Sequence, residues 1–201
     1  ITFPEGFSHF EFNKFLPEGF SQIDESSLSE FEGYLFPDTY FLSKTSDTNE
    51  LLELMKDNFD VKIANLNLNK SDLSIEDIII LASIIEREAN DEISMGLVSG
   101  ILQNRLRIGM PLQVDASVAY GLGISGIELT RENIETDGPF NTYTRSGLPE
   151  APIANPGLMA IESVLNPTPN SYLFYITGDD GNFYYAKTLE QHNDNIARHL
   201  Q

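Results

Sequence analysis

The feature that most constrains this chain is a run of apolar residues from Ile78 to Ile85, interrupted only by Ser83. Ser74 precedes it with Asp77 three positions later, a pattern typical of a helix N-terminus. A helix that is apolar on nearly every face is buried, because it has no polar side to turn towards water. The run therefore predicts a central helix around which the rest of the chain packs.

A glutamate, Glu86, follows this run directly. On a helix its side chain lies over Ala82 and Ile79, so an apolar setting would raise its pKa and favour a neutral acid at about pH 7. A neutral carboxyl group at that pH suits a general acid. The alternative is a solvated glutamate at the helix end, paired with Arg87. Glu88 points to another side of the helix and is the weaker candidate.

Composition narrows the class of protein. The chain has 201 residues with 41% apolar side chains, enough for a sizeable core in one domain or in one domain with a small appendage. No apolar run reaches the roughly 18 residues that span a bilayer. A formal charge of −19 disfavours a nucleic-acid partner, because phosphates would be repelled. The start at Ile1 without Met suggests a processed or engineered fragment whose targeting segment lies upstream.

The sequence predicts neither a metal nor a cofactor. It contains no cysteine, which excludes disulfides, thiolate metal sites and cysteine nucleophiles. Its three histidines are not spaced as metal ligands, and His192 is expected to be structural.

The first third of the chain is rich in aromatic residues and turn residues. A near-repeat, FPEGF at 3–7 and LPEGF at 16–20, predicts two turns in a small N-terminal subdomain. The aromatic segment Phe31–Phe41 is broken by a glycine and a proline, so it is irregular. It is either a structural loop or, with Glu32, a wall that binds the apolar faces of sugar rings.

Helical spacing predicts an amphipathic helix over residues 47–64 and another over 92–107, the latter capped by Asn90 and Asp91. The second would form a helical hairpin with the central helix. Asn155 is predicted to cap a further helix, with a proline at the first helical position. Two β-rich runs at 171–177 and 183–187 predict a β-hairpin, and Thr188 opens a last helix.

Polar groups after the helical hairpin are candidate substrate contacts. Residues 111–115 are expected to be extended, with Gln113 and Asp115 on one side; the alternative is an edge strand with solvated positions. The polar aromatic loop at 139–144 contains Asn141 and Tyr143, and loops of this composition more often bind than pack.

Several segments together resemble the endolytic murein transglycosylases of the MltG, or YceG-like, family. They occur in the family's order and approximate spacing over residues 31–199, namely 31–40, 81–88, 104–106, 110–115, 120–121, 141–143, 147–149 and 152–157. The resemblance implies an α+β fold. A catalytic domain at residues 31–201 would pack a helical hairpin carrying the catalytic glutamate on a small mixed or antiparallel sheet. A small, LysM-like and incomplete subdomain would occupy residues 1–30.

The resemblance also implies a function. Members of this family are bacterial enzymes held by one N-terminal transmembrane helix, with this domain on the extracytoplasmic side. They cut nascent peptidoglycan glycan strands between MurNAc and GlcNAc and leave a 1,6-anhydroMurNAc end, so glycan strands and peptidoglycan synthases are the expected partners. The family's catalytic residue is the first glutamate of its motif, which falls on Glu86. The expected substrate-binding residues are Gln113, Asp115, Asn141, Thr142, Tyr143 and Glu32.

One carboxyl group suffices for this chemistry. The acid protonates the glycosidic oxygen, and the carboxylate then takes the proton of the sugar's own C6 hydroxyl, which attacks the anomeric carbon. Two alternatives stay open. In a hydrolase, Asp115 or Glu32 would be the second carboxylate, acting on a water molecule. In a non-catalytic peptidoglycan-binding or scaffolding module, the aromatic segment Phe31–Phe41 would bind glycan without turnover.

Overall fold

The structure, a computed structural model, describes residues 1–18, 20, 25–43 and 46–200. The described chain is mostly helical with one small antiparallel sheet, which confirms the predicted α+β class. Its helices are α1 (Phe12–Phe15), α2 (Glu25–Leu28), α3 (Thr48–Ala64), α4 (Ile75–Glu88), α5 (Glu92–Arg107), α6 (Asp115–Leu122), α7 (Arg131–Glu135), α8 (Leu158–Leu165) and α9 (Leu189–His199). Its strands are β1 (Phe174–Thr177) and β2 (Phe183–Ala186), and short 3-10 turns lie at His9–Glu11, Ser29–Phe31, Leu68–Lys70 and Gly126–Glu128.

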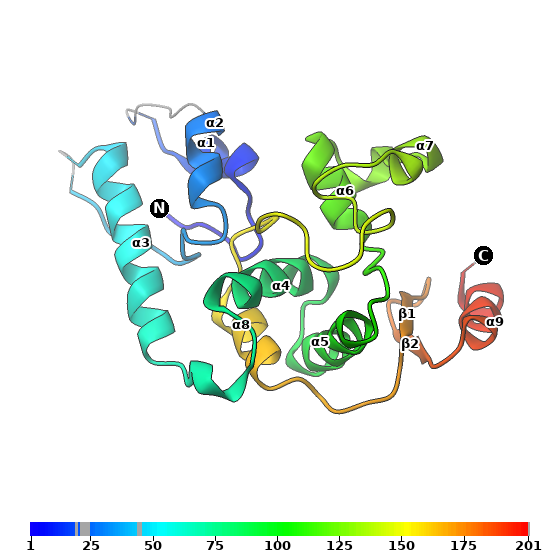
Figure 1. The fold of residues 1–201 in the computed structure, drawn as a ribbon. Helices are drawn as coiled ribbons and strands as arrows, with labels where there is room; N and C mark the ends of the chain where they lie inside the picture. The colour runs from blue at the N-terminus through cyan, green and yellow to red at the C-terminus, as the bar shows by residue number, and fades with distance from the viewer. Residues whose placement is uncertain (19, 21–24, 44–45, 201) are drawn as a thin grey trace.

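Helix α4 is the predicted central helix. Every residue from Ile78 to Ile85 is buried, and the Ser74 hydroxyl accepts the Asp77 N–H, which starts the helix where the sequence predicts. α5 follows after Asp91, whose carboxylate accepts two N–H groups of its first turn. These two helices form the predicted hairpin at the centre of the molecule (Figure 1).

The hairpin packs chiefly on α8, not on the sheet, and the predicted packing was wrong in this respect. A two-stranded sheet with four residues in each strand is too small to cover two long apolar helices, whereas α8 has apolar side chains to bury. The sheet pairs Phe174 with Ala186 and packs against α9 at the C-terminal side of the molecule (Figure 1).

The described residues contain two apolar cores. The larger one surrounds the hairpin and α8. The smaller one combines residues from both sides of residue 30, namely Phe3, Phe7, Phe12, Leu28, Leu35, Tyr40, Leu51 and Met55. The first residues therefore pack as part of a unit that continues to α3. The domain boundary at residue 30 and the LysM-like character of the segment before it stay predictions.

Two local predictions were wrong. Asp115 does not continue an extended segment; it is the first residue of α6. Asn155 does not cap α8, because the N-cap is Gly157. The Asn155 side-chain oxygen instead accepts the N–H groups of Gly33 and Leu35, at 2.9 and 3.0 Å. A polar side chain that reaches distant backbone donors is not recognisable from local spacing.

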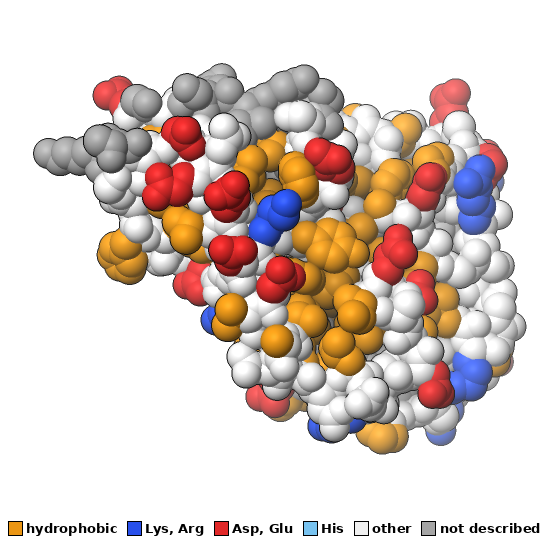
Figure 2. Space-filling model, turned by 60° about the vertical axis from the view of Figure 1, so that its left-hand side comes forward, with side chains coloured by type: hydrophobic (Ala, Val, Ile, Leu, Met, Phe, Trp, Pro, Cys, Tyr) orange, Lys and Arg blue, Asp and Glu red, His pale blue; other side chains and the backbone are white. Residues whose placement is uncertain are grey.

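The surface is acidic, as the formal charge of −19 requires. On the face drawn in Figure 2, Asp and Glu side chains surround a group of hydrophobic ones, with few Lys or Arg side chains among them. None of the described helices is both long and apolar enough to cross a membrane.

Candidate active site

The end of α4 places a second glutamate, Glu88, beside the small sheet. The phenol of Tyr175 on β1 donates a hydrogen bond of 2.8 Å to Glu88 Oε2. Burial raises the pKa of the Glu88 carboxyl, and the Tyr175 hydrogen bond opposes this in part. The negative charge of Asp115 raises the pKa further, while Arg105 and Arg87 lower it. Glu88 is thus a partly buried carboxyl group that favours its neutral form more than a solvated glutamate does.

Asp115 and Tyr143 lie next to Glu88 and contact each other. Because Asp115 begins α6, its side chain lies at the helix end that favours negative charge. The Tyr143 phenol donates a hydrogen bond to Asp115 Oδ1. Two residues before the helix, Gln113 has a φ of +51°, a conformation uncommon for residues other than glycine. Its side chain is exposed and lines the same space.

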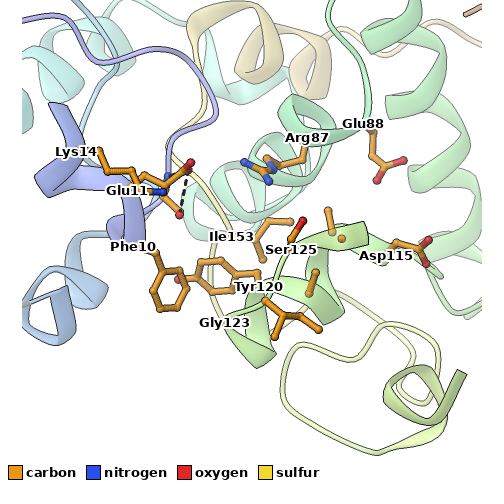
Figure 3. Close-up of a pocket in the computed structure, with 15 residues that line it drawn as sticks. Phe10, Glu11, Lys14, Arg87, Glu88, Asp115, Tyr120, Gly123, Ser125 and Ile153 are labelled. Atoms are coloured by element: carbon orange, nitrogen blue, oxygen red, sulfur yellow. Dashed lines mark hydrogen bonds between the residues drawn. The ribbon is translucent and has the colours of Figure 1, made fainter. Parts of the chain in front are cut away.

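Two cavities meet at Glu88 and Asp115. One, which we call the Phe10 cavity, has a volume of about 780 Å³ and extends between α6 and the N-terminal segment to Phe10. Figure 3 shows Glu88 and Asp115 at one end of it and Phe10 and Lys14 at the other. The other, the His192 cavity, has a volume of about 610 Å³ and lies between the hairpin, β1 and α9. Both cavities are lined by these two carboxyl groups, and we refer to the two cavities together as the groove.

Glu86 lies elsewhere. Its carboxylate accepts the N–H of Gly157, the N-cap of α8, at 2.9 Å, and Gly6 lies close to its side chain. Burial and the nearby charge of Glu5 raise the pKa of Glu86 to about 7, although the Gly157 hydrogen bond lowers it. This agrees in direction with the expected apolar setting. However, Glu86 lines neither the Phe10 cavity nor the His192 cavity.

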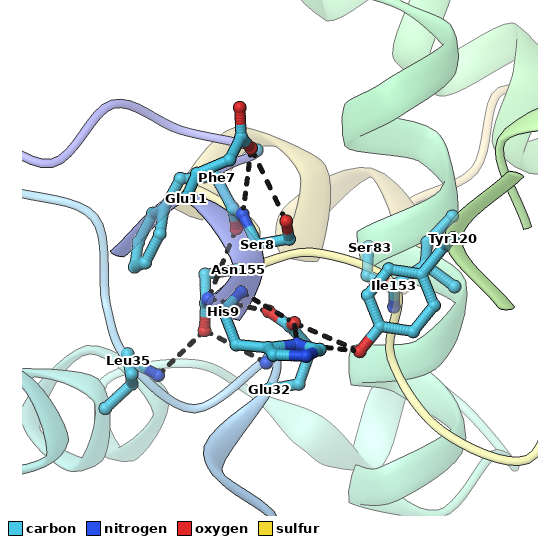
Figure 4. A network of polar contacts seen from close by, with 12 residues as sticks. Phe7, Ser8, His9, Glu11, Glu32, Leu35, Ser83, Tyr120, Ile153 and Asn155 are labelled. Carbon is cyan, nitrogen blue, oxygen red and sulfur yellow. Dashed lines mark hydrogen bonds and ion pairs between the residues drawn. The ribbon is translucent and has the colours of Figure 1, made fainter. Parts of the chain in front are cut away.

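Glu32 does not line the groove either and is part of an internal network (Figure 4). It is 2% exposed, and its carboxylate accepts hydrogen bonds from the His9 N–H, the Tyr120 phenol and the Asn155 amide, at 2.9, 3.1 and 2.8 Å. The His9 ring lies 2.5 Å from the same carboxylate. Glu32 therefore joins the N-terminal segment to α6 and to the segment before α8, and its acceptors are in use.

Two other predicted substrate contacts are buried supports of the groove wall. The Asn141 amide donates to the carbonyls of Ile134 and Thr136, and its oxygen accepts the N–H of Tyr143. The Thr142 hydroxyl accepts the Val114 N–H at 2.9 Å, directly before α6. Both side chains are less than 5% exposed. They hold Tyr143 and Asp115 in place rather than face the groove.

Three residues of the site were not predicted from the sequence. Glu88 was set aside in favour of Glu86, although both belong to the same motif. Tyr175 lies in a strand whose alternate positions look apolar. Arg105 is 5% exposed and donates to the carbonyls of Leu173 and Leu112, both at 2.6 Å. A buried arginine within an otherwise apolar helix face was the available signal, since such residues are almost always paired.

The fold and the site define a helical α+β domain with an open, acid-bearing groove. Within the described ranges, no three His, Asp or Glu side chains are grouped as metal ligands. The model of the YceG-like family matches residues 1–198, nearly the whole sequence. The chain belongs to this family.

Relatives and a solved structure agree with this assignment. An endolytic murein transglycosylase from Bacillus subtilis is 33% identical over 165 residues, which are 81% of this chain and 46% of the relative. One from Streptococcus pneumoniae is 30% identical over 185 residues, covering 88% of this chain and 34% of the relative. The chain thus spans about half or a third of the length of these curated relatives. A crystal structure of a yceG-like protein from Listeria monocytogenes is similar with a TM-score of 0.85 and 28% identity, over 96% of this chain and 74% of that one.

Proposed function

We propose that this chain is a peptidoglycan lytic transglycosylase that cuts glycan strands within the chain, between MurNAc and GlcNAc, and leaves a 1,6-anhydroMurNAc end. The observation that carries the proposal is the partly buried carboxyl group of Glu88 at the junction of two open cavities. The names of the relatives, endolytic murein transglycosylases, support the same activity.

We assign the general acid to Glu88 rather than to the Glu86 of the sequence prediction. A general acid has to come within hydrogen-bond reach of the oxygen that it protonates. Glu88 lines both cavities, and Gln113, Asp115 and Tyr143 line the groove beside it. Glu86 lines neither cavity. The raised pKa of both groups does not distinguish them, but their access to a polymer does.

In the reaction, neutral Glu88 donates its proton to the glycosidic oxygen as the bond between this oxygen and the MurNAc anomeric carbon breaks. The resulting carboxylate accepts the proton of the C6 hydroxyl of the same sugar, and the C6 oxygen bonds to the anomeric carbon. The nucleophile is tethered, so the step gains from proximity and consumes no water. Glu88 ends protonated, ready for the next cycle.

The neighbouring groups have supporting roles. The Tyr175 hydrogen bond fixes the orientation of the Glu88 carboxyl and stabilises it when ionised. The charge of Asp115 favours neutral Glu88 before the reaction and lies where positive charge develops on the sugar ring. The exposed side chain of Gln113 is the candidate for a contact with the N-acetyl group.

The groove suits cleavage inside a strand. The two cavities that Glu88 lines give room for sugars before and after the cut bond, as cleavage within a strand requires. The substrate also sets the expected location, on the extracytoplasmic side of a bacterial membrane. An anchor outside this chain and peptidoglycan synthases as partners remain part of the proposal.

The test is a pair of matched variants, Glu88→Gln and Glu86→Gln, assayed on purified glycan strands. Each keeps the side-chain shape and removes the acid. We expect Glu88→Gln to lower kcat by about 10³-fold or more, and Glu86→Gln to stay within about fivefold of the original protein. The reverse ranking would return the acid to Glu86. Full activity in both variants would place the acid on another residue, and no cleavage by the unmodified protein would favour a binding module.

The structure also leaves room for a second candidate function, a hydrolase. Asp115 faces the groove beside Glu88, so it could activate a water molecule in a hydrolase. Glu32 is not available for that role, because its carboxylate is buried and hydrogen-bonded. The two reactions give products that differ by one water, so the mass of the new strand end separates them.

A further inference from the structure

The far end of the Phe10 cavity carries two cationic side chains. Lys14 on α1 and Arg87 on α4 both line it. In Figure 3 the Glu11 side chain lies beside Lys14, between it and the Arg87 guanidinium. One nitrogen of Arg87 donates to the Gly6 carbonyl at 3.1 Å, and the residue lines the cavity.

Within the described residues, no carboxylate forms an ion pair with either cation. One acid, Glu11, also lines this end, and its Oε2 accepts the Ser8 N–H at 3.3 Å and lies 3.4 Å from the Ser8 hydroxyl. The chain has only 12 basic residues against 31 acidic ones. With two cations against one carboxylate, this end of the cavity is a local exception to a surface that otherwise repels anions.

We propose that this end of the cavity binds a carboxylate of the stem peptide that branches from the muramic acid residue, so that the enzyme selects peptide-bearing strands over bare glycan. The inference rests on the proposed function. A stem peptide leaves its sugar sideways and carries carboxylates at its glutamate residue and its C-terminus. The Phe10 cavity begins at Glu88, where the sugar would react, and ends at Lys14 and Arg87. The substrate has the same order of groups, with the muramic acid first and the peptide carboxylate beyond it.

The remaining walls suit a short peptide. Phe10 is 39% exposed and contacts Tyr120 edge-on, which gives an apolar surface beside the cations. Alanine methyl groups of a stem peptide can pack on such a surface while a carboxylate meets Lys14 and Arg87. The Arg87 fork can bind a carboxylate through two donors, and the longer, mobile Lys14 adds charge without fixed geometry.

The test compares two substrates that differ only in charge: strands with free stem-peptide carboxylates, and the same strands after conversion of these carboxylates to amides. The unmodified protein should show a lower KM for the free-carboxylate strands, with similar kcat for both. Lys14→Gln should raise KM for those strands by about threefold to tenfold and leave the amidated strands unchanged. Arg87→Gln should act in the same direction.

Two controls make the result specific. Lys14→Arg keeps the charge and should restore the preference, whereas Lys187→Gln removes an exposed lysine outside both cavities and should change neither substrate. Equal effects of Lys14→Gln on both strands, or no effect on either, would overturn the carboxylate subsite.

Failure of the reaction can be told apart from failure of the subsite. Binding of the two strand types to the Glu88→Gln protein, measured at equilibrium, repeats the comparison without turnover. A preference in binding combined with no cleavage by the unmodified protein would keep the subsite and reject the enzyme. Cleavage by the unmodified protein, with no preference between the strand types in either measurement, would keep the enzyme and reject the subsite.

Discussion

Two glutamates separated by one residue have different surroundings in this structure. Successive helix positions are rotated by about 100°, so Glu86 and Glu88 point to nearly opposite sides of α4. Glu86 meets the start of α8, whereas Glu88 meets β1 and the groove. Burial raises the pKa of both carboxyl groups. A perturbed pKa is thus an ambiguous sign of catalysis here, and the access of each group to the groove is the better criterion.

The setting of Glu86 predicts a pH-dependent contribution to stability. Its folded-state pKa of about 7 lies above the ordinary value of 4.5, so folding favours the protonated form. The stabilisation is complete below the ordinary pKa and is lost as pH rises through about 7. Glu86→Gln stays neutral and still offers an oxygen to the Gly157 N–H. We therefore expect the variant to be more stable than the original by about 1 to 2 kcal/mol at alkaline pH, after allowance for solvent screening, and equally stable in acid.

Urea unfolding of both proteins at pH values below and above this range measures the difference. The comparison between the two proteins removes the contribution of all other titrating groups. A stability difference that is the same in acid and in alkali would show that the ionisation of Glu86 is not what the structure indicates.

Among the elements, α6 and the loop from 137 to 150 depend on each other. Asn141 closes the loop through the carbonyls of Ile134 and Thr136, and Thr142 accepts the N–H of Val114 before α6. These contacts bring Tyr143 to Asp115. The loop therefore acts on the groove indirectly, by fixing the position of a carboxylate that borders Glu88.

We expect Asn141→Asp to cost about 2 to 4 kcal/mol of stability, because it replaces a buried donor by an acceptor that faces carbonyl oxygens. The variant should also lower activity, since Tyr143 and Asp115 would lose their support. Thermal unfolding and strand cleavage by the folded fraction measure the two effects. Thr144→Ala is the matched control, as it alters an exposed residue of the same loop. An Asn141→Asp protein of unchanged stability would contradict the supporting role.

The elements with a local signature were the ones that the sequence predicted well. The capped starts of α4, α5 and α9 depend on residues three positions apart, and the Glu92–Arg107 helix has the predicted bounds. The cap predicted for Asn155 was wrong because the N–H groups that it binds, those of Gly33 and Leu35, are 122 and 120 residues away in the chain. The partners of Glu32 likewise come from three separate segments, at His9, Tyr120 and Asn155. Gln113 and Asp115 were correctly placed near one another, but by a turn into α6 rather than by strand alternation.

The sequence alone does not decide between Glu86 and Glu88, for a related reason. Both follow the apolar run, and helical spacing places Glu86 over apolar neighbours, which is correct. Which side of a central helix faces a groove depends on the elements that cover it, here α8 on one side and β1 on the other. These elements begin about 70 residues or more after α4 in the sequence, so periodicity within α4 cannot reveal them.

In the whole molecule, the Phe10 cavity lies where the two cores meet. Residues of the N-terminal segment form one of its walls, and α4 and α6 form another. The Glu32 network holds these parts together, because His9 comes from the first and Tyr120 from α6 (Figure 4). A fragment that lacked the first residues would lose one side of the groove. The N-terminal segment is therefore part of the candidate site.

The most direct test of the account is the mass of the strand ends formed when the purified protein digests uncrosslinked peptidoglycan. The account predicts new MurNAc ends that are lighter by one water than reducing ends, released as fragments from within the strands, and lost in the Glu88→Gln protein. New ends that are all reducing would show that water is the nucleophile and would contradict the intramolecular mechanism.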